Sequence, residues 1–151
     1  MIRAWRIVTA KHAANAFDGE GARIAGGRWN SPGTAMVYAS GTASLAVLEM
    51  LAHLRHATTL PAYVLIACDF DDALVNAVGK LPDDWRRFPA PAHVQAIGDT
   101  WANKSQSAVL RVPSAIVEKE SNYLLNPAHP DFAKIKLHAP EPFTLDLRLV
   151  K

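Results

Sequence analysis

The sequence predicts a single α+β domain with a mainly antiparallel sheet and flanking helices. Three observations carry this prediction. The 151 residues, half of them hydrophobic and a fifth charged, suit one domain with one sizeable core, and we expect residues 1–151 to form it. Strand-like and helix-like stretches follow one another without the regular βαβ repeat of a doubly wound sheet. The glycines match neither GxGxxG after a strand nor GxxxxGK[ST], which excludes both nucleotide-binding motifs.

The first forty residues predict two strands separated by loops. Alternation in residues 2–8 indicates a first strand. Small and polar residues at 9–23 indicate a loop that contains a short helical turn at 11–17. The glycine loop 26–33 follows, and residues 35–40 form a short second strand.

The middle of the chain predicts a helix and then a buried strand. Residues 42–56 are rich in Leu and Ala, and Ser40 or Thr42 can cap the helix that they form. The run 62–70 is almost continuously apolar, which is typical of a central strand.

The last sixty residues predict one helix and two strands. A helix runs from about Pro91 towards Asn103, because proline is well tolerated in a first helical turn. Residues 108–117 form a strand interrupted at Pro113, and residues 126–130 form a turn. The alternation of leucines with polar residues at 143–150 predicts a half-buried final strand.

Composition bounds the functions that this chain can have. The net charge of +2 and the pI near 8.8 describe a mildly basic protein, and its charges are scattered. No basic stripe suggests direct nucleic-acid binding. The single cysteine, Cys68, permits no intramolecular disulfide and reads as a small core residue. Without an apolar leader or a membrane-length apolar stretch, we expect a cytoplasmic protein that does not enter a membrane.

The loop sequence GGRWN, residues 26–30, places an arginine between glycines and a turn. Glycine permits positive φ angles and close backbone approach, and the planar guanidinium of Arg28 matches phosphate oxygens. One interpretation is therefore a phosphate-binding loop. The alternative is a surface turn in which Trp29 fills the core and Asn30 caps the turn.

Glu49 conflicts with its local pattern. It is the only charged residue between Gly41 and Ala52, and on a helical wheel it lies close to Leu45, Leu48 and Ala52, along the stripe that should be buried. An ionised carboxylate in such a place is costly unless a partner pairs with it. Glu49 either points into a functional pocket, or sits at the edge of the stripe and reaches water, or forms a structural ion pair with an arginine.

Glu49, His53 and His56 also share one side of the predicted helix at metal-ligand spacing. Their order is not that of the HExxH motif, so two solvated histidines are the more ordinary interpretation and no metal is expected.

Two further residues have both a structural and a functional interpretation. Tyr38 is either a core-edge tyrosine with a hydrated hydroxyl or an aromatic wall for a flat ring. Ser114, after the proline of VPSA, is either a turn hydroxyl or a hydrogen-bond donor to a ligand. It is not in a GxSxG elbow, which argues against a hydrolase nucleophile. The Asn- and Pro-rich residues 120–132 read as a structured turn.

Two runs of the sequence resemble the RES domain, named for its Arg, Glu and Ser. They are GGRWNSPGTAMVYASGTASLAVLEML and VPSAIVEKESNYLLNPAHPDFAKI. The resemblance extends from WRI at 5–7 to the end of the chain and rests on an ordered set of motifs. One departure is Glu118, which stands where the family often has proline.

The resemblance implies a fold similar to diphtheria-toxin-type ADP-ribosyltransferases, with a mainly antiparallel split sheet. It implies the toxin of a RES–Xre toxin–antitoxin pair, which arrests growth by consuming NAD⁺ as a substrate and needs no cofactor. By matching motifs, it carries over a catalytic set and two weaker candidates for the NAD⁺ pocket. The catalytic set is Arg28, Tyr38, Glu49 and Ser114, and the weaker candidates are Asn122 and Arg6.

In that chemistry Glu49 stabilises the oxocarbenium-like ribose, and Arg28 binds the pyrophosphate. Tyr38 packs on the nicotinamide or its ribose, and Ser114 donates to the amide or to a ribose hydroxyl. Water, phosphate or a protein side chain is the acceptor, so an NAD⁺ glycohydrolase, a phosphorylase and a protein ADP-ribosyltransferase all remain open.

The resemblance also implies partners. An Xre-type helix-turn-helix antitoxin would block the pocket and bind DNA in place of this chain, and a homodimer is one compatible assembly. A non-catalytic module that only docks a partner is the alternative from another class. The presence of Arg28, Tyr38, Glu49 and Ser114 together argues against it.

Overall fold

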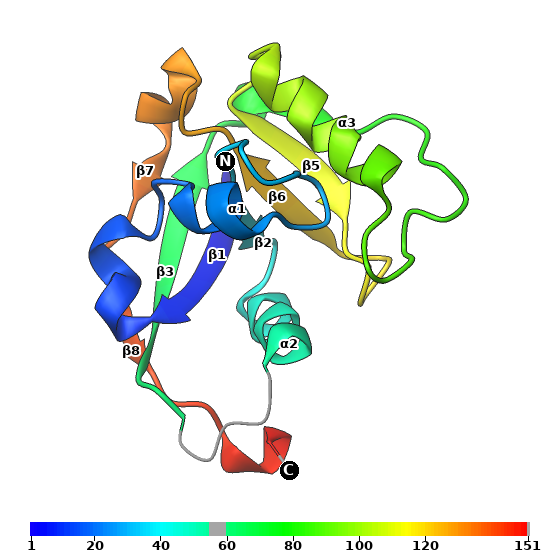
Figure 1. The fold of residues 1–151 in the computed structure, drawn as a ribbon. Helices are drawn as coiled ribbons and strands as arrows, with labels where there is room; N and C mark the ends of the chain where they lie inside the picture. Colours follow the sequence, from blue (N-terminus) through cyan, green and yellow to red (C-terminus); the bar gives the residue numbers. More distant parts are fainter. Residues whose placement is uncertain (55–59, 151) are drawn as a thin grey trace.

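The computed structural model describes residues 1–54 and 60–150. Within them the chain forms a sheet, three α-helices and several 3₁₀ turns (Figure 1). The strands are β1 Ile2–Thr9, β2 Val37–Ser40, β3 Tyr63–Phe70, β4 Val75–Ala77, β5 Val109–Pro113, β6 Ser121–Leu125, β7 Lys136–Leu137 and β8 Glu141–Phe143. The α-helices are α1 Glu20–Ala25, α2 Ala43–His53 and α3 Ala92–Asn103. The 3₁₀ turns are η1 Ala10–Asn15, η2 Asp72–Leu74, η3 Pro130–Lys134 and η4 Leu147–Leu149.

The sheet is mixed but almost entirely antiparallel, with strand order β4-β5-β6-β2-β1-β3-β7 and β8 paired to β3. Among the strands in the described residues, only β4 and β5 pair in parallel. The β1–β2 junction has the single register pair Trp5–Ser40, whereas β1 and β3 pair along their whole length. Two well-paired halves therefore meet at a weak junction within one connected sheet. These features confirm the predicted single α+β domain.

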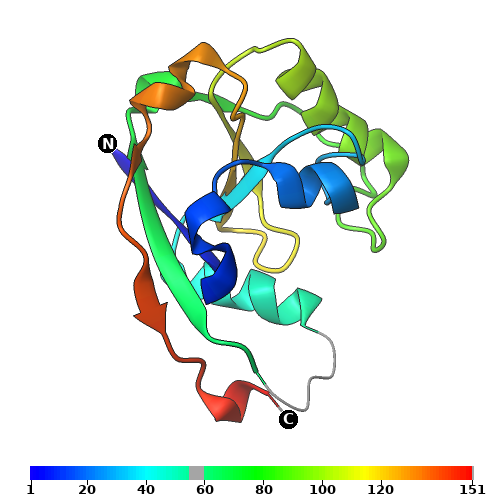
Figure 2. The same ribbon diagram turned by 60° about the vertical axis from the view of Figure 1, so that its left-hand side comes forward.

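The helices are distributed over the two halves of the sheet (Figures 1 and 2). Helix α3 lies over β5 and β6, where it contributes Val94 and Trp101 to a core cluster with Trp29 and Leu124. Helix α2 packs near β1 and β2. The opposite face of β5 and β6 buries other residues, including Leu125. None of the helices in residues 1–54 and 60–150 is long and apolar enough to cross a membrane.

The strongest local patterns gave correct predictions. The apolar run at 62–70 forms β3, which is paired on both sides. The strand predicted at 108–117 ends at Pro113, as the proline suggested. Helix α2 starts after Thr42, whose side chain accepts a hydrogen bond from the Leu45 amide at 3.0 Å. The helix predicted for 42–56 ends at His53, and its residues 55 and 56 lie outside the described residues.

The predicted final strand at 143–150 is wrong. Only Glu141–Phe143 is extended, and the chain then turns into η4, where Leu147 is 73% and Leu149 is 53% exposed. Asp146 accepts hydrogen bonds from the backbone and guanidinium of Arg148, which closes this turn locally. An alternating pattern predicts a strand only where a neighbouring strand can pair with it.

Several elements were missed by sequence reasoning. Helix α1 lies in the predicted loop 9–23 and just beyond it, and the short strands β4 and β7 gave no signal. Strand β6 lies within the predicted turn 120–132, yet it pairs with both β2 and β5. Its short apolar run next to two polar residues resembled a turn, because the partners that bury it are distant in sequence.

An ion cluster fastens β7 to the sheet. The Asp69 carboxylate, in a residue that is 9% exposed, accepts hydrogen bonds from Arg3 at 2.7 and 2.8 Å and contacts His138 Nε2 at 2.8 Å. The hydrogen bonds from Arg3 and then His138 hold the pKa of Asp69 well below its usual range. A depressed carboxyl pKa stabilises the fold above the unfolded-state pKa, and this contribution fades as the pH falls below it.

Asp69→Asn is therefore expected to lower the free energy of unfolding near neutral pH. The difference from the wild type should shrink as the pH falls below about 4, the pKa of an unfolded aspartate. Urea denaturation of both proteins between pH 7 and pH 2.5 measures this. A difference that stays constant over that range would contradict a stabilising ionised Asp69.

Candidate functional site

Glu49 lies at the centre of a hydrogen-bonded group drawn from three elements. Glu49 lies two turns after Thr42, the N-cap of α2, and its side chain contacts residues just after β5 and in β6. Glu49 Oε1 accepts hydrogen bonds from Ser114 Oγ and from Asn122 Nδ2, both at 2.8 Å. Oε2 has no hydrogen-bond partner among the described residues. The carboxylate is thus fixed through one oxygen and available through the other.

The two donors are themselves held in place. Ser114 is completely buried, and its Oγ accepts the amides of Ile116 and Val117 at 3.0 Å each. Because those amides occupy its acceptor positions, its proton is directed to Glu49. Asn122 Oδ1 accepts the Ser40 hydroxyl at 2.8 Å, which orients the amide so that Nδ2 faces Glu49. Buried polar networks that are fully satisfied rigidify a site.

The GGRWN loop is fastened to Tyr38. The Tyr38 hydroxyl donates to Asn30 Oδ1 at 2.6 Å and accepts the Trp29 amide at 3.0 Å, and burial raises the pKa of Tyr38. A Cβ at Gly27 would lie 2.6 Å from this hydroxyl, so the close approach that glycine permits here is to Tyr38. Gly26 has a φ of +75°, which also favours glycine.

The core-facing residues of the loop behave as sequence reasoning expected. Trp29 is buried and packs on Trp85 with ring centroids 6.1 Å apart, which confirms it as a core residue. The Asn30 side chain donates to backbone carbonyls at Ala22 and Thr34, as a turn cap does.

Arg28 projects from the loop and is held by the segment 81–91. Its Nη1 donates to the carbonyls of Trp85 at 2.9 Å and Arg87 at 2.8 Å. Partial burial lowers the pKa of Arg28, and the nearby charge of Glu49 opposes that shift. The charges of Arg28 and Glu49 interact electrostatically, but the two side chains form no ion pair among the described residues. Nε and Nη2 make no hydrogen bonds there and remain available to an anion.

Arg6 has a more structural placement. Its Nε donates to the Ala16 carbonyl at 2.7 Å and its Nη1 to the Tyr38 carbonyl at 2.8 Å. Burial lowers the pKa of Arg6. Much of its donor capacity is therefore used to brace β1 against β2 and the segment after η1.

Part of the reasoning that singled out Glu49 is wrong. Leu48 is 40% exposed and Ala52 is exposed, so the stripe through Glu49 is not buried along its length. Glu49 itself is half-buried at the edge of that stripe. The described residues hold no group of three potential metal ligands, and His53 Nδ1 instead contacts the Glu49 carbonyl at 2.8 Å. His56 lies outside the described residues.

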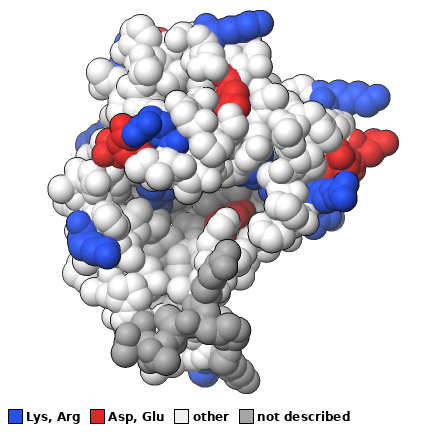
Figure 3. Space-filling view, viewed as in Figure 1, with Lys and Arg blue, Asp and Glu red and all other residues white. Residues whose placement is uncertain are grey.

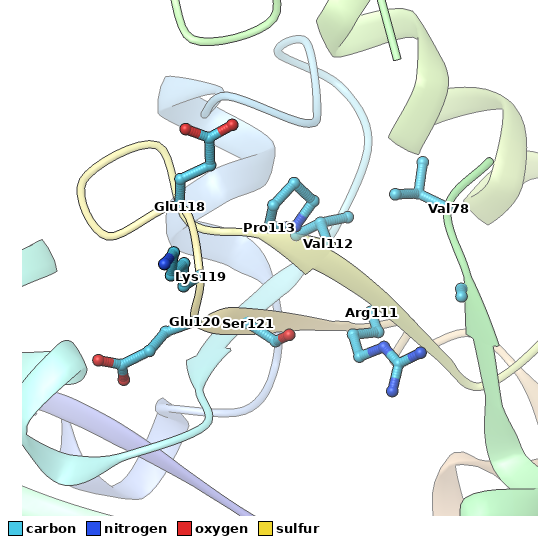
Figure 4. A pocket seen from close by; sticks show the side chains of 9 residues that line it. Val78, Arg111, Val112, Pro113, Glu118, Lys119, Glu120 and Ser121 are labelled. Atoms are coloured by element: carbon cyan, nitrogen blue, oxygen red, sulfur yellow. The ribbon is translucent and has the colours of Figure 1, made fainter. Parts of the chain in front are cut away.

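The molecular surface is hollowed between α1 and α2, with acidic and basic side chains visible inside (Figure 3). A separate cavity lies elsewhere in the described part of the chain. It measures about 210 Å³ and lies between β4, β5 and the loop before β6, lined by none of the six predicted site residues (Figure 4). Arg111 and Lys119 line it, but so do Glu118 and Glu120, so it shows no preference for charge.

Tyr38→Phe tests how the loop is held. Removing the hydroxyl leaves the Asn30 side-chain oxygen and the Trp29 amide without this partner, which costs about 1–3 kcal/mol when such groups are buried. We expect a lower urea midpoint at unchanged m-value. Tyr63→Phe is the control, because the Tyr63 hydroxyl makes no hydrogen bond among the described residues. Equal midpoints for Tyr38→Phe and the wild type would show that the hydroxyl does not fasten the loop.

The fold and the site together define a class of protein. It is a small α+β domain in which a helix-borne carboxylate, fixed by serine and asparagine, lies within electrostatic range of a loop arginine that has unused donors. A sequence model of the RES domain matches residues 3–146, so the chain belongs to the RES domain family.

Known relatives agree with this assignment. The chain is 37% identical over 148 residues to "Toxin Res" of Yersinia enterocolitica, covering 96% of this chain and 97% of the relative. It is 38% identical over 154 residues to "Prs ADP-ribosylating toxin" of Sphingobium sp. (strain YBL2), covering 97% of this chain and 96% of the relative.

A solved structure shows the same fold. A chain of the M. tuberculosis MbcT–MbcA toxin–antitoxin complex superposes with a TM-score of 0.77 at 22% identity, covering 95% of this chain and 84% of that one. At that identity the likeness establishes the fold alone.

The structure thus brings Glu49, Ser114 and Asn122 into direct contact and places Arg28 within their electrostatic reach. Their roles in binding or catalysis stay predictions. Sequence reasoning missed Ser40, which it considered only as a helix cap, and the carbonyls of Trp85 and Arg87, since backbone acceptors leave no sequence signal.

Proposed function

We propose that this protein is the toxin of a toxin–antitoxin pair and that it consumes NAD⁺ by cleaving the nicotinamide–ribose bond. The observation that carries the proposal is the Glu49 carboxylate, held at Oε1 by Ser114 and Asn122 while Oε2 remains unbonded within the described residues. The name of the Yersinia relative supports a toxin, and the name of the Sphingobium relative supports ADP-ribose chemistry.

The chemistry fits a carboxylate in this position. When the bond between ribose C1′ and the nicotinamide nitrogen breaks, its electron pair neutralises the cationic pyridinium, so no strong acid is needed. Positive charge develops at C1′ and the ring oxygen. A preorganised negative charge at Glu49 stabilises that state, and Oε2 can also accept a ribose hydroxyl. An acceptor oxygen then bonds to C1′ and releases its proton.

The other residues bind and orient the substrate in this proposal. Arg28 uses its free Nε and Nη2 donors on the pyrophosphate, because a guanidinium binds phosphate oxygens in pairs. Ser114 and Asn122 orient Glu49, and Tyr38 fixes the loop beside the nicotinamide ribose. Arg6 supports Tyr38 through its carbonyl. NAD⁺ is the substrate, and no cofactor is needed.

Transfer of ADP-ribose to a protein side chain is the second candidate. The Sphingobium relative, named as an ADP-ribosylating toxin, favours it. Both candidates share the bond cleavage at C1′ and differ only in the acceptor. The likeness to ADP-ribosyltransferases of the diphtheria-toxin type belongs to this proposal as well.

The proposal includes a partner. The solved toxin–antitoxin complex with the same fold supports an antitoxin partner, and the RES resemblance implies an Xre-type helix-turn-helix protein that blocks the pocket. A toxin that acts on cellular NAD⁺ would work in the cytoplasm. Self-association as a homodimer is compatible with this assembly.

Product analysis tests the function and separates its versions. Purified protein is incubated with NAD⁺ labelled in the adenosine half, with and without inorganic phosphate, and with and without cell lysate. Release of nicotinamide together with free ADP-ribose indicates hydrolysis. Release of nicotinamide together with the 1-phosphate of ADP-ribose indicates phosphorolysis, and label on a protein of the lysate indicates transfer. No nicotinamide release under any of these conditions would refute the enzymatic proposal and favour a module that only docks a partner.

A further inference from the structure

Arg86 connects two segments that otherwise hold separate parts of the site. It lies in the turn 82–87, where the Trp85 amide donates to Pro82 at 3.1 Å and the Arg87 amide donates to Asp84 at 3.0 Å. The Asp84 carboxylate also contacts His93 of α3 at 2.8 Å. This turn is the segment whose carbonyls hold Arg28.

The Arg86 side chain reaches across to the loop 114–120. Its Nε and Nη2 both donate to the Ala115 carbonyl, at 3.1 and 3.0 Å, and its Nη1 pairs with Glu118 Oε2 at 3.1 Å. Figure 4 shows the Glu118 carboxylate turned away from Arg111, on the far side of the cavity. All three contacts fall on the loop that begins with Ser114.

The contact with Ala115 is close to the Glu49 network. Ala115 lies between Ser114, which donates to Glu49, and Ile116, whose amide donates to Ser114. A fork of two donors on one carbonyl fixes the direction of that peptide group. Arg86 therefore constrains the backbone that sets the direction of the Ser114 hydroxyl.

We propose that Arg86 is a positioning residue that couples the Arg28 side of the site to the Ser114–Glu49 side. It acts through the Ala115 carbonyl rather than by touching the substrate. As a consequence, the segment that holds Arg28 and the loop that orients the Glu49 carboxylate move as one unit. This inference rests on the proposed NAD⁺ cleavage for its kinetic consequences but not for its structural ones.

The exposure of the contacts separates this role from general stabilisation. The Arg86 and Glu118 side chains are 48% and 61% exposed, and ion pairs at such exposure contribute little to global stability. Removing Arg86 should therefore leave the unfolding midpoint nearly unchanged while it loosens one loop. Removing a residue that only stabilised the fold would instead lower the unfolding midpoint without selectively loosening this loop.

The test compares Arg86→Ala, Arg86→Lys and Lys119→Ala, each alone and with Ser114→Ala. Lys119 is the matched control, because it carries the same charge as Arg86, lies on the loop that Arg86 contacts, and its side chain makes no hydrogen bond or ion pair within the described residues. We expect Arg86→Ala to lower kcat for NAD⁺ about tenfold or more in the wild-type background and by less than twofold with Ser114→Ala. Lysine, which lacks the planar fork, should restore only part of the rate.

Hydrogen exchange supplies a readout without activity. In Arg86→Ala, the amides of Ile116 and Val117 should exchange faster than in the wild type or in Lys119→Ala, with the unfolding midpoint unchanged. If these amides exchange faster in Arg86→Ala but the wild-type protein releases no nicotinamide from NAD⁺, the proposed function is refuted and the structural coupling by Arg86 stands. Unchanged exchange, or an Arg86→Ala effect on kcat that is equal in both backgrounds, would overturn the role of Arg86.

Discussion

Glu49→Gln is expected to lower kcat for NAD⁺ cleavage by about 10²–10³-fold, the loss typical of removing one preorganised electrostatic partner of a transition state. The substitution removes the charge but keeps the shape. The glutamine oxygen can still accept from Ser114 and Asn122 at the position of Oε1, while an amide group replaces Oε2. We therefore expect unfolding that resembles the wild type, together with a binding constant for NAD⁺ that changes much less than kcat.

The control for this variant is Glu141→Gln. Glu141 is an exposed carboxylate on β8 with no hydrogen-bond partner among the described residues, so its loss of charge should leave turnover near that of the wild type. Nicotinamide release followed over time measures all three proteins. Turnover by folded Glu49→Gln within a few fold of the wild type would remove Glu49 from the chemistry.

Gly98→Ala is expected to have the largest effect on stability. In an open helix alanine is favoured over glycine by about 1 kcal/mol, which would predict a gain. Here a Cβ at Gly98 would overlap the backbone carbonyl oxygen of Trp29, and a backbone group cannot rotate aside as a side chain can. We expect a net loss of about 2 kcal/mol or more, which for this length lowers Tm by about 4–8 °C.

Gly21→Ala is the matched control for Gly98→Ala. Gly21 also lies in a helix, α1, but a Cβ there would meet nothing within 4 Å. This variant should be neutral or slightly stabilising. Because Trp29 follows Arg28, Gly98→Ala should also weaken NAD⁺ binding at temperatures where the protein stays folded. A Tm for Gly98→Ala equal to that of Gly21→Ala would show that a Cβ at position 98 of α3 does not clash with the Trp29 carbonyl of the GGRWN loop.

The sequence predicted those elements whose signal is local. The β3 strand has a continuous apolar run, α2 has a cap at Thr42, and Pro113 ends β5. Elements that depend on distant partners were not predictable in this way. Strand β6 is recognised only through β2 and β5, and the leucines after Phe143 alternate without a strand to pair with.

The candidate site shows the same division. Glu49 was conspicuous because a lone charge interrupts an apolar stretch, although that stretch is less buried than its pattern indicated. Its contacts with Ser114 and Asn122 span 65 and 73 residues of sequence, so only the family resemblance could group them beforehand. Arg86 had no signal of its own, because its partner is mainly a backbone carbonyl.

One glycine within the GGRWN loop and one in α3 explain how closely this loop is packed. Gly27 gives room to Tyr38, and Gly98 of α3 gives room to Trp29. The loop is therefore packed from two sides, and Arg28 projects from a rigid base. A rigid base is what a site needs if its charges are to be preorganised for a transition state.

We propose that NAD⁺ lies between Arg28 and Glu49, and a crystal structure of Glu49→Gln with NAD⁺ would show whether it does. We expect the pyrophosphate within hydrogen-bond distance of Arg28 Nε and Nη2, and the nicotinamide ribose beside the side-chain amide at position 49. NAD⁺ bound elsewhere, for example in the cavity between β4 and β5, with Arg28 and residue 49 unliganded at saturating NAD⁺, would contradict it.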